Sequence, residues 1–135
     1  MKHTTTLAAL VLPIALLAGC AALAPQGAED TVRQRANEYW AARVKYDFPA
    51  AYAYTAPGYR ALHAEQAFRT RQGGAVVYKS AQAVAVRCPE PTKCLVNMRL
   101  EAKPFMMRGF RDNIVTHVEE TWLWQDGQWW LFLKP

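Results

Sequence analysis

The chain has 135 residues, of which 52% are apolar, 20% charged and 12% aromatic, and its formal net charge is +5. This composition is typical of a packed globular domain and excludes intrinsic disorder. With only seven glycines, eight prolines and three cysteines, collagen-like and cysteine-dense scaffolds are excluded as well. The positive charge does not indicate a nucleic-acid partner, because no nucleic-acid-binding motif is present.

The amino terminus has the features of an export signal. Lys2 and His3 precede an apolar run over residues 7–18. This run is shorter than the roughly 20 helical residues needed to cross a bilayer, but it suits a secretory signal peptide. Residues 17–20, Leu-Ala-Gly-Cys, resemble the bacterial lipobox. The resemblance implies transfer of diacylglycerol to the sulfur of Cys20, cleavage before Cys20 and acylation of the new amino group. The rival interpretation is an ordinary signal peptide with a chance cysteine.

The lipobox resemblance sets the expected organisation and location. Residues 1–19 form the signal peptide, residues 20–29 a lipidated tether and residues 30–135 one domain. Several acyl chains on Cys20 would anchor the protein stably in a membrane. Ala21, and not aspartate, follows the cysteine, which in Gram-negative lipoproteins points to the outer membrane. We therefore expect an outer-membrane lipoprotein of the cell envelope that faces the periplasm.

Cys88 and Cys94 are predicted to form a disulfide. They flank a turn-rich segment, residues 89–93, between two apolar stretches that suit the strands of a hairpin. An exported protein meets oxidising conditions, in which paired cysteines are usually bridged. A zinc site would need more ligands, and a redox pair would favour the tighter Cys-x-x-Cys spacing.

Three helices are predicted after the tether. Thr31 and Gln34 can form a capping box, and apolar residues then recur every four positions, which predicts a helix over residues 31–46. Asp47 can cap a short second helix over residues 49–54, with Pro49 in its first turn. A third helix is predicted over residues 62–71 and is closed by Gly73.

The apolar period changes to two after Gly74, which predicts antiparallel strands. The first covers residues 76–86, with the even-numbered side chains on one face. The second covers residues 94–105 and the third residues 114–124, again with the even-numbered side chains on one face. Asp126-Gly127 predicts a tight hairpin turn, and residues 128–134 form the last strand.

Helices followed by antiparallel strands indicate the α+β class. The order resembles the nuclear transport factor 2-like superfamily, which includes SnoaL-like and ketosteroid isomerase-like proteins. The likeness is carried by YDFPAAYAYTAPGYR at residues 46–60 and EETWLWQDGQWWLF at residues 119–132. It implies three N-terminal helices packed on a curved antiparallel sheet in a cone-shaped fold. Enzymes of the superfamily hold acid–base groups in the mouth of the cone, other members lack catalysis, and relatives dimerise through their sheets, which makes a homodimer an expectation here.

The catalytic candidates are Glu120, Asp47 and Tyr59. Glu120 shares a strand face with Trp122, and a carboxylate beside apolar groups suits a general acid. Asp47 is explained most simply as a helix cap. Tyr59 belongs to an aromatic cluster that forms either core or the lining of a cavity, whereas His63 is predicted to be solvated. No metal site and no cofactor are predicted, because metal-ligand spacing and a phosphate-binding loop are lacking.

Residues 103–111 mix bulky apolar groups with cations, which indicates either a partner surface or a bend of a long strand. The candidate surface consists of Lys103, Phe105, Met106, Arg108, Phe110 and Arg111. Together these features favour a non-catalytic binding or scaffolding module for an envelope protein or a small apolar ligand. The alternative is an isomerase-, dehydratase- or hydrolase-type enzyme that uses a carboxylate in the pocket of the cone.

Overall fold

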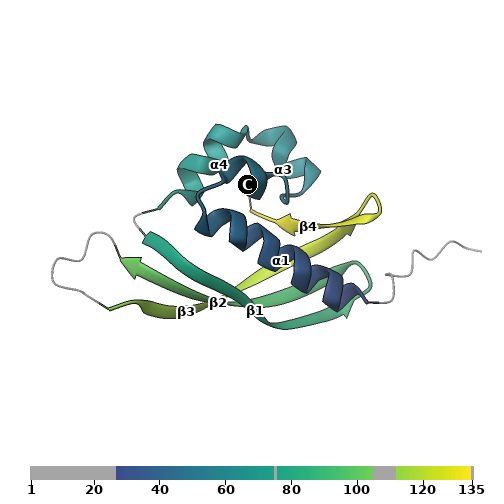
Figure 1. Ribbon diagram of the computed structural model, residues 1–135. Coiled ribbons are helices and arrows are strands. Elements are labelled where there is room, and N and C mark those ends of the chain that lie inside the picture. Colours follow the sequence, from purple (N-terminus) through teal and green to yellow (C-terminus); the bar gives the residue numbers. More distant parts are fainter. Residues whose placement is uncertain (1–26, 75, 105–111, 135) are drawn as a thin grey trace, which may run out of the picture.

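The computed structural model describes residues 27–74, 76–104 and 112–134. Four helices precede four strands in the order α1 (Ala28–Val44), α2 (Phe48–Tyr52), α3 (Pro57–Leu62), α4 (Glu65–Gln72), β1 (Val76–Glu90), β2 (Lys93–Pro104), β3 (Ile114–Gln125) and β4 (Gln128–Phe132). The strands form one antiparallel sheet in the order β1-β2-β3-β4 (Figure 1). Cys20, its lipobox and residues 105–111 lie outside the described residues.

The first helix starts earlier than its sequence predicts. It begins at Ala28, within the predicted tether, and Gly27 precedes it with a positive φ of 86°. Thr31 is not a cap, because it lies inside α1 and its backbone N–H donates to the Gly27 carbonyl at 3.0 Å. Glu29 and Asp30 occupy the first turn, where negative charge is favoured by the helix dipole. The predicted capping box is therefore wrong.

The helices after α1 are shorter than predicted. Asp47 caps α2 as expected, since its side chain accepts a hydrogen bond from the Ala50 N–H at 3.1 Å. The single helix predicted over residues 62–71 is wrong, because α3 and α4 divide this region. Pro57 opens α3, for which its fixed φ is suited. His63 then ends α3 in an extended conformation with φ −132° and ψ 118°.

The second strand matches its predicted pattern, but the first does not. Val96, Met98 and Leu100 on β2 are all buried on one face. In β1 the register shifts between Tyr78 and Ser80 and again between Ala83 and Ala85. These irregularities change which side chains face the core, as β-bulges do. Ala83 and Val86 are consequently buried, while Val84 is 43% exposed, so the predicted single face of even-numbered residues is wrong.

Both predicted connections of the sheet are present. The β3–β4 hairpin turns at Asp126 and Gly127, which have φ of 51° and 76°, as a turn with positive φ at both central positions requires. At the end of the β1–β2 hairpin, Cys88 and Cys94, the pair expected from the sequence, are joined by a disulfide.

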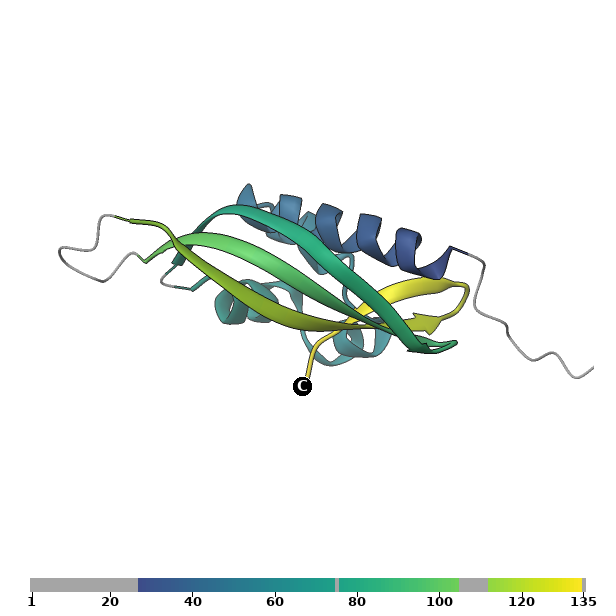
Figure 2. The same ribbon diagram turned by 90° about the horizontal axis from the view of Figure 1, so that it is seen from below.

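The core lies between α1 and the inner face of the sheet. Figure 2, seen from below, shows the twisted strands with α1 to one side of them. Val32, Ala36 and Trp40 of α1 are buried in one cluster with Trp122 and Leu131 of the hairpin. Each fully buried large apolar side chain contributes about 1.5–3 kcal/mol to folding.

Side chains of α1 also bind the edge strand β1. Arg33 Nη1 donates to the Ala83 carbonyl at 3.0 Å, and the Ala83 N–H donates to Asn37 Oδ1 at 2.9 Å. Both backbone groups of this edge residue are therefore satisfied by α1.

The expected arrangement of three N-terminal helices on a curved sheet in a cone-shaped, nuclear transport factor 2-like fold is wrong. Among the described helices only α1 runs along the sheet, where it contacts β1, β2 and β4 (Figure 1). The shorter α3 and α4 lie on the side of α1 that is away from β1 and β2, and α2 packs on α1 and α4. Backbone pairing of the α2–α3 connection with β4, together with the helix start at Pro57, fixes α3 beside the last strand.

Candidate functional site

The position of α3 is set by backbone pairing across the edge of the sheet. The Leu131 N–H donates to the Tyr54 carbonyl at 2.9 Å, and the Ala56 N–H donates to the Leu131 carbonyl at 3.0 Å. Because Pro57 opens α3 immediately afterwards, the first turn of α3 stands next to the β3–β4 hairpin. Residues that are about 70 positions apart in the chain thus enclose a common space.

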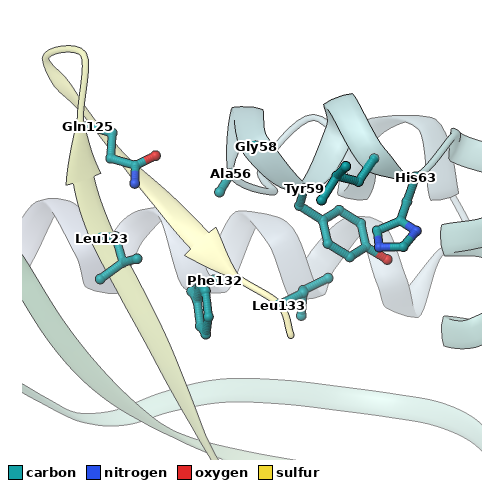
Figure 3. A pocket seen from close by; sticks show the side chains of 9 residues that line it. Ala56, Gly58, Tyr59, His63, Leu123, Gln125, Phe132 and Leu133 are labelled. Carbon is teal, nitrogen blue, oxygen red and sulfur yellow. The ribbon is translucent and has the colours of Figure 1, made fainter. Parts of the chain in front are cut away.

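This space is an apolar hollow of about 240 Å³ between α3 and the hairpin (Figure 3). Leu62 and Phe132 are 72% and 42% exposed, which is unusual for large apolar side chains that lie together. Ligand pockets usually measure about 300–1,000 Å³, so the hollow suits one small apolar group. Its walls are formed by Ala56, Gly58, Tyr59, Leu62, His63, Leu123, Gln125, Phe132 and Leu133.

Two polar side chains lie side by side on the helical wall of the hollow. The rings of Tyr59 and His63 have centroids 4.7 Å apart, and Figure 3 shows both at the same end. The His63 carbonyl accepts a hydrogen bond from the Tyr52 hydroxyl at 2.6 Å. Its Nε2 is buried and has no hydrogen-bond partner among the described residues. A buried polar atom without a partner is costly, which marks this end of the hollow as polar and incompletely satisfied. His63 is half-buried, so the prediction that it is solvated is met only in part.

A cation stands next to the hollow. The Arg60 guanidinium lies over the Trp130 ring, 4.7 Å from its centroid. Trp130 is the cross-strand partner of Leu123, which lines the hollow. Neither Arg60 nor Trp130 could be predicted as a site residue, because only the pairing of the α2–α3 connection with β4 brings them together.

Glu120 lies elsewhere, on the inner face of the sheet beneath α1. Its Oε1 accepts a hydrogen bond from Trp40 Nε1 at 2.6 Å, and its Oε2 accepts one from Trp122 Nε1 at 3.3 Å. Burial raises the pKa of Glu120 to about 7, although both indole hydrogen bonds and the charge of Arg43 favour the ionised form. Glu120 therefore lies beside large aromatic side chains, as expected from the strand face that it shares with Trp122.

The groups around Glu120 also include Tyr39 and Arg43 of α1, which are held in place by each other and by Gln72 of α4. Arg43 is buried and donates to the Tyr39 hydroxyl at 2.8 Å and to Gln72 Oε1 at 2.8 Å. Its guanidinium also lies 5.0 Å from the centroid of the Trp40 ring. Burial raises the pKa of Tyr39 to about 12. The sequence signal for this cluster is the four-residue spacing of Tyr39 and Arg43 on one helix, which our sequence interpretation missed.

The three catalytic candidates do not form one site. Tyr59 lines the hollow, whereas Asp47 is an exposed helix cap and Glu120 lies beneath α1. A second, more open hollow, formed in part by Arg35, Tyr54 and Gln128, likewise contains neither carboxylate.

The candidate partner surface falls mainly outside the described residues. Lys103 is exposed on β2 and pairs with Val77. Phe105, Met106, Arg108, Phe110 and Arg111 belong to the part of the chain that the structure does not describe. Within residues 27–74, 76–104 and 112–134, no cluster of three or more metal-ligating side chains is found. In the same ranges no helix combines the length and apolar character required to span a bilayer.

Comparison with known proteins gives a similarity of fold only. No protein-family model matches the chain, and no curated protein matches it. Among solved structures, a SEC-C motif containing protein from Rhodopseudomonas palustris, determined in solution, has a TM-score of 0.52 and 16% sequence identity. The match covers 68% of this chain and 67% of that chain. The likeness to the SEC-C motif protein replaces the expected nuclear transport factor 2-like cone.

Proposed function

We propose that this chain is a non-catalytic binding module of the cell envelope that holds a small apolar ligand in the hollow between α3 and the β3–β4 hairpin. The observation that carries the proposal is the exposure of Leu62 and Phe132 on the two sides of one apolar cavity. Water in such a cavity gains few hydrogen bonds, so an apolar group that displaces it is favoured. The neighbouring Tyr59 and His63 side chains make one end of the hollow polar, which would orient the ligand.

The proposed location rests on the amino-terminal sequence. The apolar run at residues 7–18 and the Leu-Ala-Gly-Cys motif support an outer-membrane lipoprotein that is acylated at Cys20 and faces the periplasm. The Cys88–Cys94 disulfide is consistent with an oxidising compartment. A membrane anchor would hold the hollow close to a supply of apolar molecules.

One observation favours a second candidate, an enzyme of the isomerase, dehydratase or hydrolase type. The raised pKa of Glu120 is a property of many general acids. A substrate would have to reach this carboxylate, but both oxygens of Glu120 already accept hydrogen bonds from Trp40 and Trp122. The two described hollows also do not include Glu120. We therefore assign Glu120 a structural role in the proposal.

A hollow-filling substitution tests the binding function. A Cβ placed on Gly58, which lines the hollow, meets no atom within 4 Å, so Gly58→Leu can be accommodated without a backbone clash. Gly74 is equally open and does not line the hollow, which makes Gly74→Leu a matched control. The probe is 1-octanol, titrated into the full chain in non-ionic detergent while leucine methyl groups are followed by NMR.

The expected result is a saturable shift of the Leu62, Leu123 and Leu133 methyl signals. Gly58→Leu should abolish these shifts, and Gly74→Leu should leave them unchanged. Leu100, which is buried in the core, serves as an internal reference that should not respond. The proposal would be refuted if the hollow-lining leucines failed to shift in the parent chain, or if they shifted equally in Gly58→Leu.

A further inference from the structure

The apolar hollow has a positively charged neighbour that is fixed in place. Arg60 follows Tyr59 on α3, and its guanidinium covers the Trp130 ring at 4.7 Å. Trp130 and Phe132 are two residues apart on β4 and therefore share a face, about 7 Å apart along the strand. Phe132 lines the hollow, and so does Leu123, the cross-strand partner of Trp130, so the indole and the guanidinium above it adjoin the hollow without lining it.

The Arg60 guanidinium keeps part of its hydrogen-bonding capacity. Nη1 donates to the carbonyls of Ala53 and Thr55, which fixes the orientation of the group. Over the described residues, Nε and Nη2 donate no hydrogen bond, and no carboxylate lies within 4.0 Å of the guanidinium. Nε and Nη2 form an edge of the planar group that can bind both oxygens of a carboxylate.

A second guanidinium adds to the positive charge around the same indole. Arg35 lies 5.6 Å from the centroid of the Trp130 ring, and its Nε donates to the Trp129 carbonyl at 2.7 Å. Glu38, which lies on the same helix, is hydrogen-bonded to the Tyr54 hydroxyl at 3.0 Å and forms no ion pair with Arg35 in the described part of the chain. Two cations thus flank the Trp130 ring, Arg60 beside the apolar hollow and Arg35 in the second, more open one, and no carboxylate among the described residues forms an ion pair with either.

We propose that the ligand is a single-chain carboxylate of the fatty-acid class, whose carboxylate binds Arg60 and whose alkyl chain fills the hollow. The inference rests on the proposed function and adds the chemical class of the ligand. A methylene group takes about the volume of a water molecule, roughly 30 Å³, so a cavity of about 240 Å³ accepts about eight carbons. The fork of an arginine matches a carboxylate better than an ammonium does, which fits the residue type beside the hollow.

Two probes of equal chain length separate the contribution of the charge from that of the alkyl chain. Octanoate and 1-octanol are titrated into the full chain in non-ionic detergent, and the methyl signals of Leu62, Leu123 and Leu133 give the half-saturation concentration of each. Arg60→Gln should weaken octanoate binding about tenfold, the factor that one charge-assisted hydrogen bond supplies. The same substitution should leave octanol binding within about twofold, and added salt should weaken octanoate only.

Control variants exclude a loss of folding as the cause. Arg60→Lys keeps the charge without the fork and should weaken octanoate binding less than Arg60→Gln does. Arg69 also stacks on an aromatic ring, that of Phe48 at 5.7 Å, but Phe48 belongs to the buried core cluster and not to the β3–β4 hairpin that forms one wall of the hollow. Arg69→Gln should therefore change neither titration.

Each possible negative result of these titrations leads to a different conclusion. If both probes bind and Arg60→Gln affects them equally or not at all, the carboxylate inference is overturned and the binding function stands. If neither probe shifts the hollow-lining leucines, both proposals fall. If octanoate fails to bind while a protein cross-links to a photoreactive residue at Phe132 in intact cells, the hollow belongs to a protein partner and the carboxylate inference is overturned.

Discussion

Replacing Glu120 by glutamine should change the stability of the fold in a direction that depends on pH. The half-buried carboxylate lies beneath α1, and desolvation raises its pKa from an ordinary value of 4.5 to about 7. Below pH 4.5 it is protonated in both the folded and the unfolded chain, so its burial carries no penalty. As the pH rises from 4.5 to 7, only the unfolded chain ionises, and the fold is progressively destabilised. Above pH 7 both states are ionised and the penalty is constant.

The magnitude follows from the same two pKa values. Each pKa unit corresponds to about 1.4 kcal/mol, so the penalty at pH 8 is about 3 kcal/mol, a value that already includes the attraction of Arg43. Glutamine can still accept the hydrogen bond from Trp40, but its amide group cannot also accept the longer one from Trp122, which costs about 1 kcal/mol. We therefore expect Glu120→Gln to lower the free energy of unfolding by about 1 kcal/mol at pH 4.5 and to raise it by about 2 kcal/mol at pH 8.

The measurement is urea unfolding of the parent chain and the variant at several pH values, followed by tryptophan fluorescence in non-ionic detergent. Taking the difference between the two chains cancels titrating groups that they share. Glu119 is the matched control, because it lies exposed on the opposite face and pairs with Arg87 at 3.1 Å. Glu119→Gln should change stability by less than about 1 kcal/mol at every pH. A pH-independent difference for Glu120→Gln would refute the claim that ionisation of a buried carboxylate controls stability.

Three further substitutions test single features of the fold. Replacing both Cys88 and Cys94 by serine should lower the free energy of unfolding by about 2 kcal/mol, because the short closed loop constrains the unfolded chain. The measurement is urea unfolding without reductant. An equal effect of added reductant on the stability of the parent and of the variant would contradict this prediction. Asp47→Ala should cost about 1 kcal/mol in the same assay through loss of the bond from Ala50, and should leave octanol binding unchanged; a loss of binding would instead place Asp47 in the site. Gly127→Ala should lower the free energy of unfolding by about 1 kcal/mol in thermal unfolding, because alanine disfavours the φ of 76° at this position. The added Cβ meets no neighbour, so no clash adds to this cost. A neutral result would show that the turn relaxes.

The parts of the fold that depend on local sequence could be predicted. The four-residue apolar spacing in α1, the alternation along β2 and the Asp126-Gly127 turn are properties of short segments, and each is present in the structure. The three register shifts of β1 depend on pairing with β2, so the period of the first strand alone could not reveal them. The start of α3 at Pro57 could not be predicted, because a proline can follow one helix or open another.

The candidate site depends on contacts that are distant in sequence. The environment of Glu120 was half predictable, because Trp122 is two residues away on the same strand, but Trp40 is 80 residues away. The hollow depends on the bridge between Thr55 and Leu131, for which the sequence has no local signal. Tyr59 could be named from its aromatic cluster, but its neighbours across the hollow could not.

The bonds from Arg33 and Asn37 to Ala83 have a consequence for the protein at high local concentration. The outermost strand of an open sheet can template the addition of a strand from another molecule, which begins ordered aggregation. Here the side chains of Arg33 and Asn37 occupy both backbone hydrogen-bonding groups of Ala83, near the middle of that strand. When molecules are crowded on a surface, the hydrogen-bonding edge of β1 that each one presents is therefore interrupted at Ala83. This interruption disfavours the joining of two molecules into a continuous sheet.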